Sequence, residues 1–270
     1  MSKKIIAIDL DGTLLHHDDT ISDYTVDIIK KIQELGHLVI ISTGRPYRMA
    51  YKHYRRLGLS TPMINFNGSL IHIPEKKWEF EHSVTIDKQY LIDILKLEKE
   101  FKIDFIASEY HQKFYIASKN ITTVTPELFG VEKILPNMLL DQSKITDNPN
   151  ALLMQTSHSD KYQLAQDIKK HFNYNIEVAS WGGPLNILEF SPKGINKAYA
   201  LSYLLNVLKT SSENLFAFGD EHNDTQMLKF AGRGFAMKNA SPLLLPFADE
   251  QLEYTNDEDG VAKKLAELFL

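Results

Sequence analysis

Short, continuous apolar runs alternate with amphipathic segments along the first third of the chain. The runs at 5–8 and 37–42, and the segment at 62–68, are typical of strands buried on both faces of a parallel sheet. Two helices are expected between them, at 22–36 and 46–58. Strand and helix in regular alternation predict an α/β fold with a doubly wound parallel sheet. In such a sheet, ligands bind beyond the carboxyl ends of the strands.

The alternation stops near residue 69 and resumes near residue 185. A hairpin is expected from segments 69–73 and 78–84, after which the pattern becomes an α+β mixture. The expected elements of the mixed region are a helix at 87–101, strands at 103–107, 113–117 and 151–157, a helix at 160–172 and a strand at 175–180. Those of the last part are a strand at 185–190, a helix at 195–208, a strand at 215–219, a helix from 221 and a final helix ending at Leu270. The sequence therefore predicts a core of residues 1–83 and 186–270 with an inserted domain at 84–185.

Composition narrows the classes of function. The 270-residue chain contains no cysteine, which excludes thiolate nucleophiles, disulfides and cysteine-bound zinc. A net charge of −5 gives no basic footprint, so a nucleic-acid partner is not expected. No apolar run approaches the ~18 residues of a membrane span, and the run at 5–8 is too short for a signal peptide. We expect a cytoplasmic protein, a monomer or homodimer, with a small charged partner. The adjacent pair His16 and His17 is most simply a surface feature.

Two carboxylates follow the first apolar run. Because side chains alternate along an extended chain, Asp9 and Asp11 lie on the same side and can reach one ligand. One carboxylate can then attack while the other handles protons, as phosphoryl transfer requires. An Asp-Gly pair at Gly12 alone would indicate an ordinary turn, but the full D-x-D-G-T pattern is much rarer by chance.

A second acidic cluster follows the apolar run at 215–219. Asp220, Asn223 and Asp224 share a face by their three- and four-residue spacings. Helix capping is the ordinary explanation of such a cluster, but together with Asp9 it also supplies the oxygen ligands that Mg²⁺ prefers. Lysine at the start of the helix at 195–208 can supply positive charge for phosphate; Lys197 is the candidate and Lys193 the competing choice.

These motifs, in this order, resemble those of the haloacid dehalogenase superfamily in its phosphatase branch. The segments that carry the resemblance are DLDGTLL at 9–15, ISTGRP at 41–46, KGINKAYAL at 193–201 and FGDEHNDTQML at 218–228. FNGSLI at 66–71 and the tail from Gly234 resemble the Cof-type subfamily, which has a Rossmann-like core and a large α/β cap. Two positions depart from that pattern: Lys238 and Ala198 stand where glycine is usual.

The resemblance implies a mechanism through an aspartyl phosphate. Asp9 would be the nucleophile and Asp11 the general acid and base. The implied phosphate-binding groups are Leu10, Thr43, Gly44, Asn223 and Lys197, and Asp9, the Asp11 carbonyl and Asp220 would ligate Mg²⁺. Asp224 would ligate through water or orient Lys197, with Arg45 and Asn67 in support. Lys197 and the metal would neutralise charge on the transferring group.

The reaction expected is hydrolysis of small phosphorylated metabolites, such as sugar phosphates or phosphorylated cofactors. A sugar phosphomutase is the nearest alternative, because family members with a similar cap move phosphate within a sugar. A non-catalytic phosphate-binding or sensory protein is a second alternative, although binding alone does not need the carboxylate of Asp11. The substrate itself is not specified by the motifs, and we expect residues 84–185 to select it.

Overall fold

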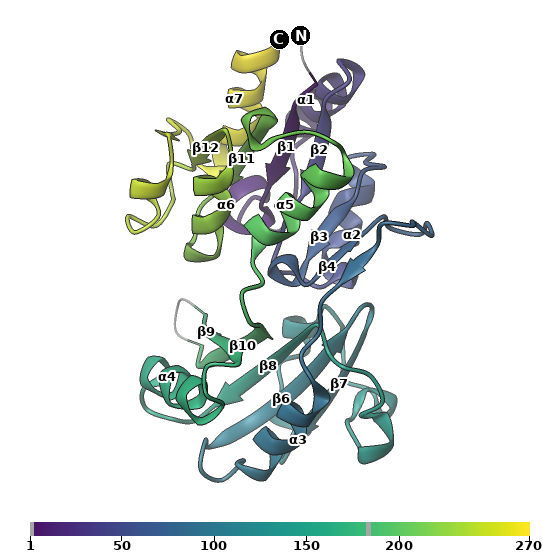
Figure 1. Ribbon diagram of the computed structural model, residues 1–270, viewed down its shortest axis with the longest axis vertical. Helices are drawn as coiled ribbons and strands as arrows, with labels where there is room; N and C mark the ends of the chain where they lie inside the picture. The colour runs from purple at the N-terminus through teal and green to yellow at the C-terminus, as the bar shows by residue number, and fades with distance from the viewer. Residues whose placement is uncertain (1–2, 182–184) are drawn as a thin grey trace. The chain divides into compact units, whose positions relative to one another are not determined.

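The computed structural model describes residues 3–181 and 185–270 (Figure 1). It divides into two compact units. The first unit comprises the chain up to Arg45, Ala50–His82 and Asn196–Leu270. The second comprises Pro46–Met49 and Ser83–Ile195. The second unit is therefore an insertion that interrupts the first, apart from one helical turn after Arg45.

A parallel sheet forms the centre of the first unit. Its strand order is β13-β12-β11-β1-β2, so the first strand lies between β11 and β2 (Figure 1). The strands are β1 Ile5–Ile8, β2 Leu38–Ile41, β11 Leu215–Gly219, β12 Arg233–Ala236 and β13 Glu250–Gln251. Ile5 is in register with Leu215 on one side and with Leu38 on the other. All four residues of β1 are buried, which explains its uninterrupted apolar sequence.

Helices and a small antiparallel sheet complete this unit. The helices are α1 Asp23–Glu34, α2 Tyr47–Arg56 (from Ala50 onward in this unit), α5 Lys197–Val207, α6 Thr225–Phe230 and α7 Gly260–Phe269. The small sheet has the order β3-β4-β5, with β3 Met63–Asn65, β4 Leu70–His72 and β5 His82–Ser83. Ser22 and Asn196 cap α1 and α5 by accepting from backbone N–H groups. The doubly wound α/β core predicted from the sequence is thus confirmed.

Two local features differ from the sequence-based expectation. Strands β12 and β13 were not anticipated, because they are short and lie toward one edge of the sheet. The segment at 62–68 pairs as a strand only at Met63–Asn65, since Phe66 and Asn67 both adopt positive φ and turn the chain into β4. β3 nevertheless continues the parallel sheet through a single bridge between Ser42 and Ile64.

The second unit is built on an antiparallel sheet of order β7-β6-β8-β10-β9. Its strands are β6 Ile103–Tyr110, β7 Lys113–Ser118, β8 Ala151–Thr156, β9 Ile176–Ser180 and β10 Ile187–Pro192, and its helices are α3 Lys88–Lys96 and α4 Lys161–His171. Leu91 and Ile94 of α3 and Leu164 and Ile168 of α4 pack in one core with sheet residues such as Ile106. This unit has its own hydrophobic core.

Strand β10 lies in a different sheet from the one its sequence suggested. We expected the apolar run from Leu185 to resume the parallel sheet, with the core restarting at 186. Instead β10 pairs antiparallel with both β8 and β9, and the second unit extends to Ile195. A strand buried on both faces has the same apolar sequence in either kind of sheet. The apolar sequence of β10 therefore does not determine which strands it pairs with; tertiary packing does.

A buried ion pair lies within the second unit. Arg48 donates from both terminal nitrogens to Glu109, at 2.6 and 2.8 Å, and from Nε to the Phe129 carbonyl at 2.8 Å. Its guanidinium also lies over the Phe114 ring, 4.3 Å from the centroid. All three of these contacts use the planar fork that distinguishes arginine from lysine.

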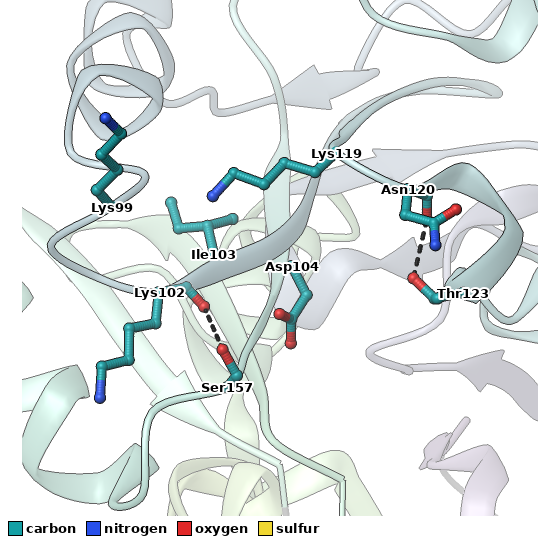
Figure 2. A pocket seen from close by; sticks show the side chains of 8 residues that line it. All are labelled: Lys99, Lys102, Ile103, Asp104, Lys119, Asn120, Thr123 and Ser157. Carbon is teal, nitrogen blue, oxygen red and sulfur yellow. Dashed lines mark hydrogen bonds between the residues drawn. The ribbon is translucent and has the colours of Figure 1, made fainter.

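Three lysines line a surface pocket of the second unit, with a volume of about 330 Å³ (Figure 2). Lys99 and Lys102 point away from each other, and Lys119 is paired with Glu98 at 2.8 Å. Their charges therefore do not converge on one ligand.

In the part of the chain that the structure describes, no helix is long and apolar enough to cross a membrane.

Candidate active site

Asp9 leaves β1 at the carboxyl edge of the parallel sheet. Its N–H still donates to the Phe218 carbonyl of β11 at 3.1 Å, so the backbone is fixed by the sheet up to this residue. A tight turn follows at Leu10–Leu14, closed by the Leu15 N–H bonding to the Leu10 carbonyl at 2.9 Å. The turn passes through Gly12 at φ +68°, where a side chain would be strained.

Lys197 is the centre of the site. It is the first residue of α5 and is fully buried, and its Nζ donates to Asp9 Oδ1 at 2.6 Å and to Asp224 Oδ1 at 2.7 Å. The competing Lys193 is exposed. The sequence-based preference for Lys197 therefore agrees with where the side chain lies.

Asp224 uses both of its oxygens within the protein. Oδ1 accepts from Lys197, and Oδ2 accepts from the backbone N–H groups of Asp220 and Glu221 at 3.0 and 3.3 Å. The close approach depends on Gly219, because a Cβ there would lie 2.5 Å from the Asp224 Cβ. Asp224 is thus held between the end of β11 and the lysine.

Asp220 completes a cluster of carboxylates. One oxygen each from Asp9, Asp220 and Asp224 lies within 4.8 Å of the others, the spacing of ligands around one metal ion. Thr13 donates its hydroxyl to Asp220 Oδ1 at 3.2 Å. Asp220 Oδ2 sits where a Cβ of Gly12 would be, only 2.1 Å away. An all-oxygen donor set of this kind suits a hard divalent cation.

Burial is the main cause of the raised pKa values of Asp9 and Asp220, and neighbouring carboxylates add to it. Burial raises the pKa of Asp9 well above its ordinary value of 3.8; Lys197 opposes that rise and the neighbouring carboxylates add to it. Burial, followed by the charge of Asp224, raises the pKa of Asp220 to about 7. For Lys197, burial alone would lower the pKa, but Asp224 and Asp9 together raise it. One buried ammonium does not balance three carboxylates, and a bound cation would.

Asp11 lies at the exposed end of the site, with its side chain 59% exposed. The Arg45 guanidinium donates to both of its oxygens, from Nε at 2.9 Å and from Nη2 at 2.5 Å. Thr43 is buried, and its hydroxyl accepts from the Arg45 N–H at 3.1 Å. The structure therefore brings Thr43 and Arg45 next to the D-x-D turn.

The remaining predicted groups also lie at this edge. Asn223 Nδ2 donates to Asn67 Oδ1 at 3.0 Å, and the amide of Asn67 lies against Gly44, 3.1 Å from where a Cβ would stand. Leu10 has a buried side chain, so only its backbone can serve a ligand. Lys238 is exposed, and its backbone bonds to Tyr254 and Gln251.

Some residues of the site carried no recognisable signal. Thr13 contacts Asp220, and Asn239 donates to the Gly12 carbonyl at 2.8 Å. The threonine is part of D-x-D-G-T and could have been named from its position; Asn239 could not. His16 and His17 bond to Asp259 and Asp257, outside this cluster.

A strand-end aspartate held by a buried lysine, beside two further carboxylates, lies at the edge of a doubly wound α/β fold where ligands bind. The sequence model of the haloacid dehalogenase-like hydrolases matches residues 6–265. The chain belongs to this family, as its motifs indicated.

Known relatives agree with this assignment. The chain is 33% identical over 273 residues to the Bacillus subtilis 5-amino-6-(5-phospho-D-ribitylamino)uracil phosphatase YitU, covering 98% of this chain and 97% of that protein. It is 31% identical to the Bacillus subtilis phosphatase YwpJ, covering 98% and 100%. A haloacid dehalogenase-like hydrolase from Bacteroides thetaiotaomicron has a similar structure, with a TM-score of 0.85, 26% identity and coverage of 99% and 100%. The predicted enzyme class, a phosphoric monoester hydrolase, is confirmed.

Proposed function

We propose that the protein is a Mg²⁺-dependent phosphatase that hydrolyses small phosphorylated metabolites through an aspartyl phosphate on Asp9. The observation that carries the proposal is the buried Lys197, which holds Asp9 and Asp224 beside Asp220. A lysine in this position fixes the orientation of Asp9 and supplies positive charge where a phosphoryl group would be transferred.

Asp9 and Asp11 divide the chemistry between them. An Asp9 oxygen attacks phosphorus as the bond to the leaving oxygen breaks, and Asp11 gives that oxygen a proton. In the second half-reaction Asp11 takes a proton from water, which attacks phosphorus and releases inorganic phosphate from Asp9. Thr43, the Gly44 N–H, the Leu10 backbone and Asn223 hold the phosphoryl oxygens. Asp224, whose two oxygens are already bonded, orients Lys197.

Asp9, Asp220 and the backbone carbonyl of Asp11 would hold the metal. A bound Mg²⁺ would neutralise charge on the phosphoryl oxygens and on the crowded carboxylates. The raised pKa values of Asp9 and Asp220 support this donor set, since a nearby cation would favour the ionised form of both carboxylates against the effect of burial.

The substrate class is inferred from the relatives. YitU and a second Bacillus subtilis relative, YcsE, which is 31% identical over 267 residues, are both named for 5-amino-6-(5-phospho-D-ribitylamino)uracil. That compound is an alkyl phosphate on a polyol chain, so its leaving oxygen needs the proton that Asp11 would supply. We infer that the inserted unit, predicted from the sequence as residues 84–185, selects among such substrates.

The test measures inorganic phosphate released from this compound, from a hexose phosphate and from p-nitrophenyl phosphate, with Mg²⁺ and after chelation. Turnover should require the metal, and Asp9→Asn should be inactive on all three. Full activity in metal-free protein would contradict the metal assignment. Conversion of one sugar phosphate into another without release of phosphate would instead indicate a phosphomutase.

The intermediate is tested with Asp11→Asn, which keeps the nucleophile and removes the acid and base. With an alkyl phosphate, the first step should slow by roughly 10²–10⁴-fold. Nitrophenolate leaves without a proton, so p-nitrophenyl phosphate should give a burst of about one product per site, then slow turnover. Equal losses on both substrates, without a burst, would show that Asp11 has another role.

A further inference from the structure

Arg45 bonds to two aspartates at once. Two of its nitrogens grip Asp11, as described above, and the third, Nη1, lies 2.7 Å from Asp19 Oδ1. The Arg45 side chain is only 16% exposed, so its orientation is set by these partners and not by water. Asp19 is thus the fixed point on the far side of the guanidinium from Asp11.

Asp19 is held in an uncommon backbone conformation. It has φ +63°, in the left-handed region, which non-glycine residues seldom adopt although aspartate does so more readily than most. The turn that holds it is closed at both sides: the Asp19 N–H donates to the His16 carbonyl, and the His16 N–H to the Thr20 carbonyl, each at 3.0 Å. Backbone strain that is maintained in this way is a frequent property of functional positions.

The cationic groups around Asp19 keep it ionised. Burial opposes ionisation, but hydrogen bonds from Lys52 and Arg45 outweigh it, and the pKa of Asp19 lies below its ordinary value. His53 Nε2 is 3.2 Å from the same oxygen that Arg45 contacts. Burial lowers the pKa of His53 to about 4, so at neutral pH the ring is uncharged. Its Nε2 also lies 3.5 Å from Arg45 Nη1. On its buried side, the Asp19 carboxylate therefore has Arg45 as its charged partner.

We propose that Asp19 is a positioning residue for the acid–base step: it holds the Arg45 guanidinium in the plane from which that group grips both oxygens of Asp11. The inference rests on the proposed function, because it assumes that Asp11 is the acid and base. Fixed geometry matters for this step, since misplacement of a catalytic group by about 1 Å can cost 10²-fold in rate. Without Asp19, one guanidinium nitrogen loses its charged partner and Asp11 loses its fixed orientation.

The test is Asp19→Asn, which keeps the size of the side chain and removes its charge. Single-turnover rates are measured with enzyme in excess, using glycerol 2-phosphate as the alkyl phosphate and p-nitrophenyl phosphate as the aryl phosphate. We expect alkyl cleavage to fall about 10-fold, while nitrophenol release changes by less than about twofold, because only the alkoxide needs a proton in this step. A purely structural role for Asp19 would lower both rates together.

Asp18→Asn is the matched control. Asp18 is the neighbouring aspartate of the same turn and bonds to the N–H and hydroxyl of Thr20. Its rates on both substrates should match the wild type, and the thermal unfolding of both variants should confirm that they are folded. Lys52→Met, which removes the exposed partner of Asp19, should also leave the ratio of alkyl to aryl rates unchanged.

Two outcomes would overturn the inference. They differ in whether the proposed acid–base role of Asp11 fails as well. If Asp11→Asn separates alkyl from aryl cleavage but Asp19→Asn does not, Asp19 has no positioning role and the proposed function stands. If Asp11→Asn itself shows no separation, both the acid–base assignment and the role of Asp19 are wrong.

Discussion

Two groups of buried charges in this protein contain cations and anions in different proportions. In the second unit, Arg48 and Glu109 form a one-to-one pair in which each carboxylate oxygen receives its own N–H. At the end of β1, one ammonium, that of Lys197, faces a cluster of three carboxylates. The first group is balanced within the chain, and the second is not.

This difference in charge balance distinguishes a structural ion pair from a site that can bind a cation. A buried bidentate pair satisfies its own desolvation cost as far as geometry allows and needs nothing further. A cluster with surplus negative charge is destabilised until a cation or a proton arrives, because its carboxylates repel one another. Burial raises the pKa of Glu109 as well as those of Asp9 and Asp220, so a raised pKa alone does not distinguish the two regions. Imbalance of buried charge, more than burial itself, therefore marks the functional region.

The largest effect should come from Asp9→Asn. Loss of the nucleophile should reduce phosphate release by roughly 10⁴-fold or more. The free energy of unfolding of metal-free protein should stay level or rise, because one of the crowded carboxylates is neutralised. Glu109→Gln is the comparison: its activity should remain within a fewfold of wild type. Substantial activity in Asp9→Asn would remove the nucleophile from the proposed mechanism.

Arg48→Met should have the largest effect on stability. It leaves Glu109 charged, buried and without its guanidinium, a loss typically of about 3–5 kcal/mol in the free energy of unfolding. Urea titration measures it, and the double variant Arg48→Met/Glu109→Leu should recover most of the loss. A single-variant effect below about 1 kcal/mol would mean that the pair is not the balanced unit described above.

The unbalanced cluster should make metal-free protein less stable as pH rises. Because the folded-state pKa of Asp220 is raised from 3.8 to about 7, its contribution is fully present below about pH 3.8 and is lost as pH rises through about 7. Wild type should lose roughly 1–3 kcal/mol more than Asp220→Asn between pH 5 and pH 8, since solvent partly screens this half-buried group. Mg²⁺ should stabilise wild type more at pH 8 than at pH 5, and a pH-independent effect would contradict the metal site.

The smallest effect is expected from alanine substitutions at two glycines that have left-handed backbone conformations. Gly12→Ala and Gly130→Ala should each cost about 1 kcal/mol of strain, since their φ values are +68° and +64°. Only Gly12→Ala places a methyl group against Asp220, whereas Gly130→Ala meets the flexible side chain of Met49. Mg²⁺ binding, followed by calorimetry, should weaken roughly 10-fold in the first variant alone. Equal affinities would mean that Asp220 is not a ligand.

Much of the core was predictable because its local signals agree with its tertiary structure. Apolar runs predicted β1, β2 and β11, helices were expected where α1 and α5 form, and Asp9, Thr43 and Asp220 follow strand ends in the sequence. The proximity of Asp9 and Asp220 could be anticipated for the same reason: strands of a parallel sheet bring their carboxyl ends to one edge. The strand before Lys197, β10, is not part of that sheet, so the place of Lys197 was expected from the family resemblance. The roles of these residues remain predictions.

The features that could not be predicted depend on tertiary contacts, which leave no local pattern in the sequence. β10 reads as a core strand, yet pairs in the second unit, because burial on both faces leaves no trace of the partner's direction. β12 begins with Arg233 and Gly234 and so shows no continuous apolar run, and β13 has only two residues. Asp19 lies in a run of polar residues that looks like an ordinary loop, and its contact with Arg45 arises from a left-handed turn.

The position of β1 between β2 and β11 has a consequence for how the chain is made. β1 pairs with β2, which follows soon after it, and with β11, which is about two hundred residues away; Asp9 and Lys197 are 188 residues apart. During synthesis the first strand must therefore wait, with one edge unpaired, until the whole inserted unit has left the ribosome. Long sequence separation of this kind slows folding and leaves strand edges open to wrong partners. Because the inserted unit has its own core, it can fold meanwhile, and the catalytic apparatus is completed only near the end of translation.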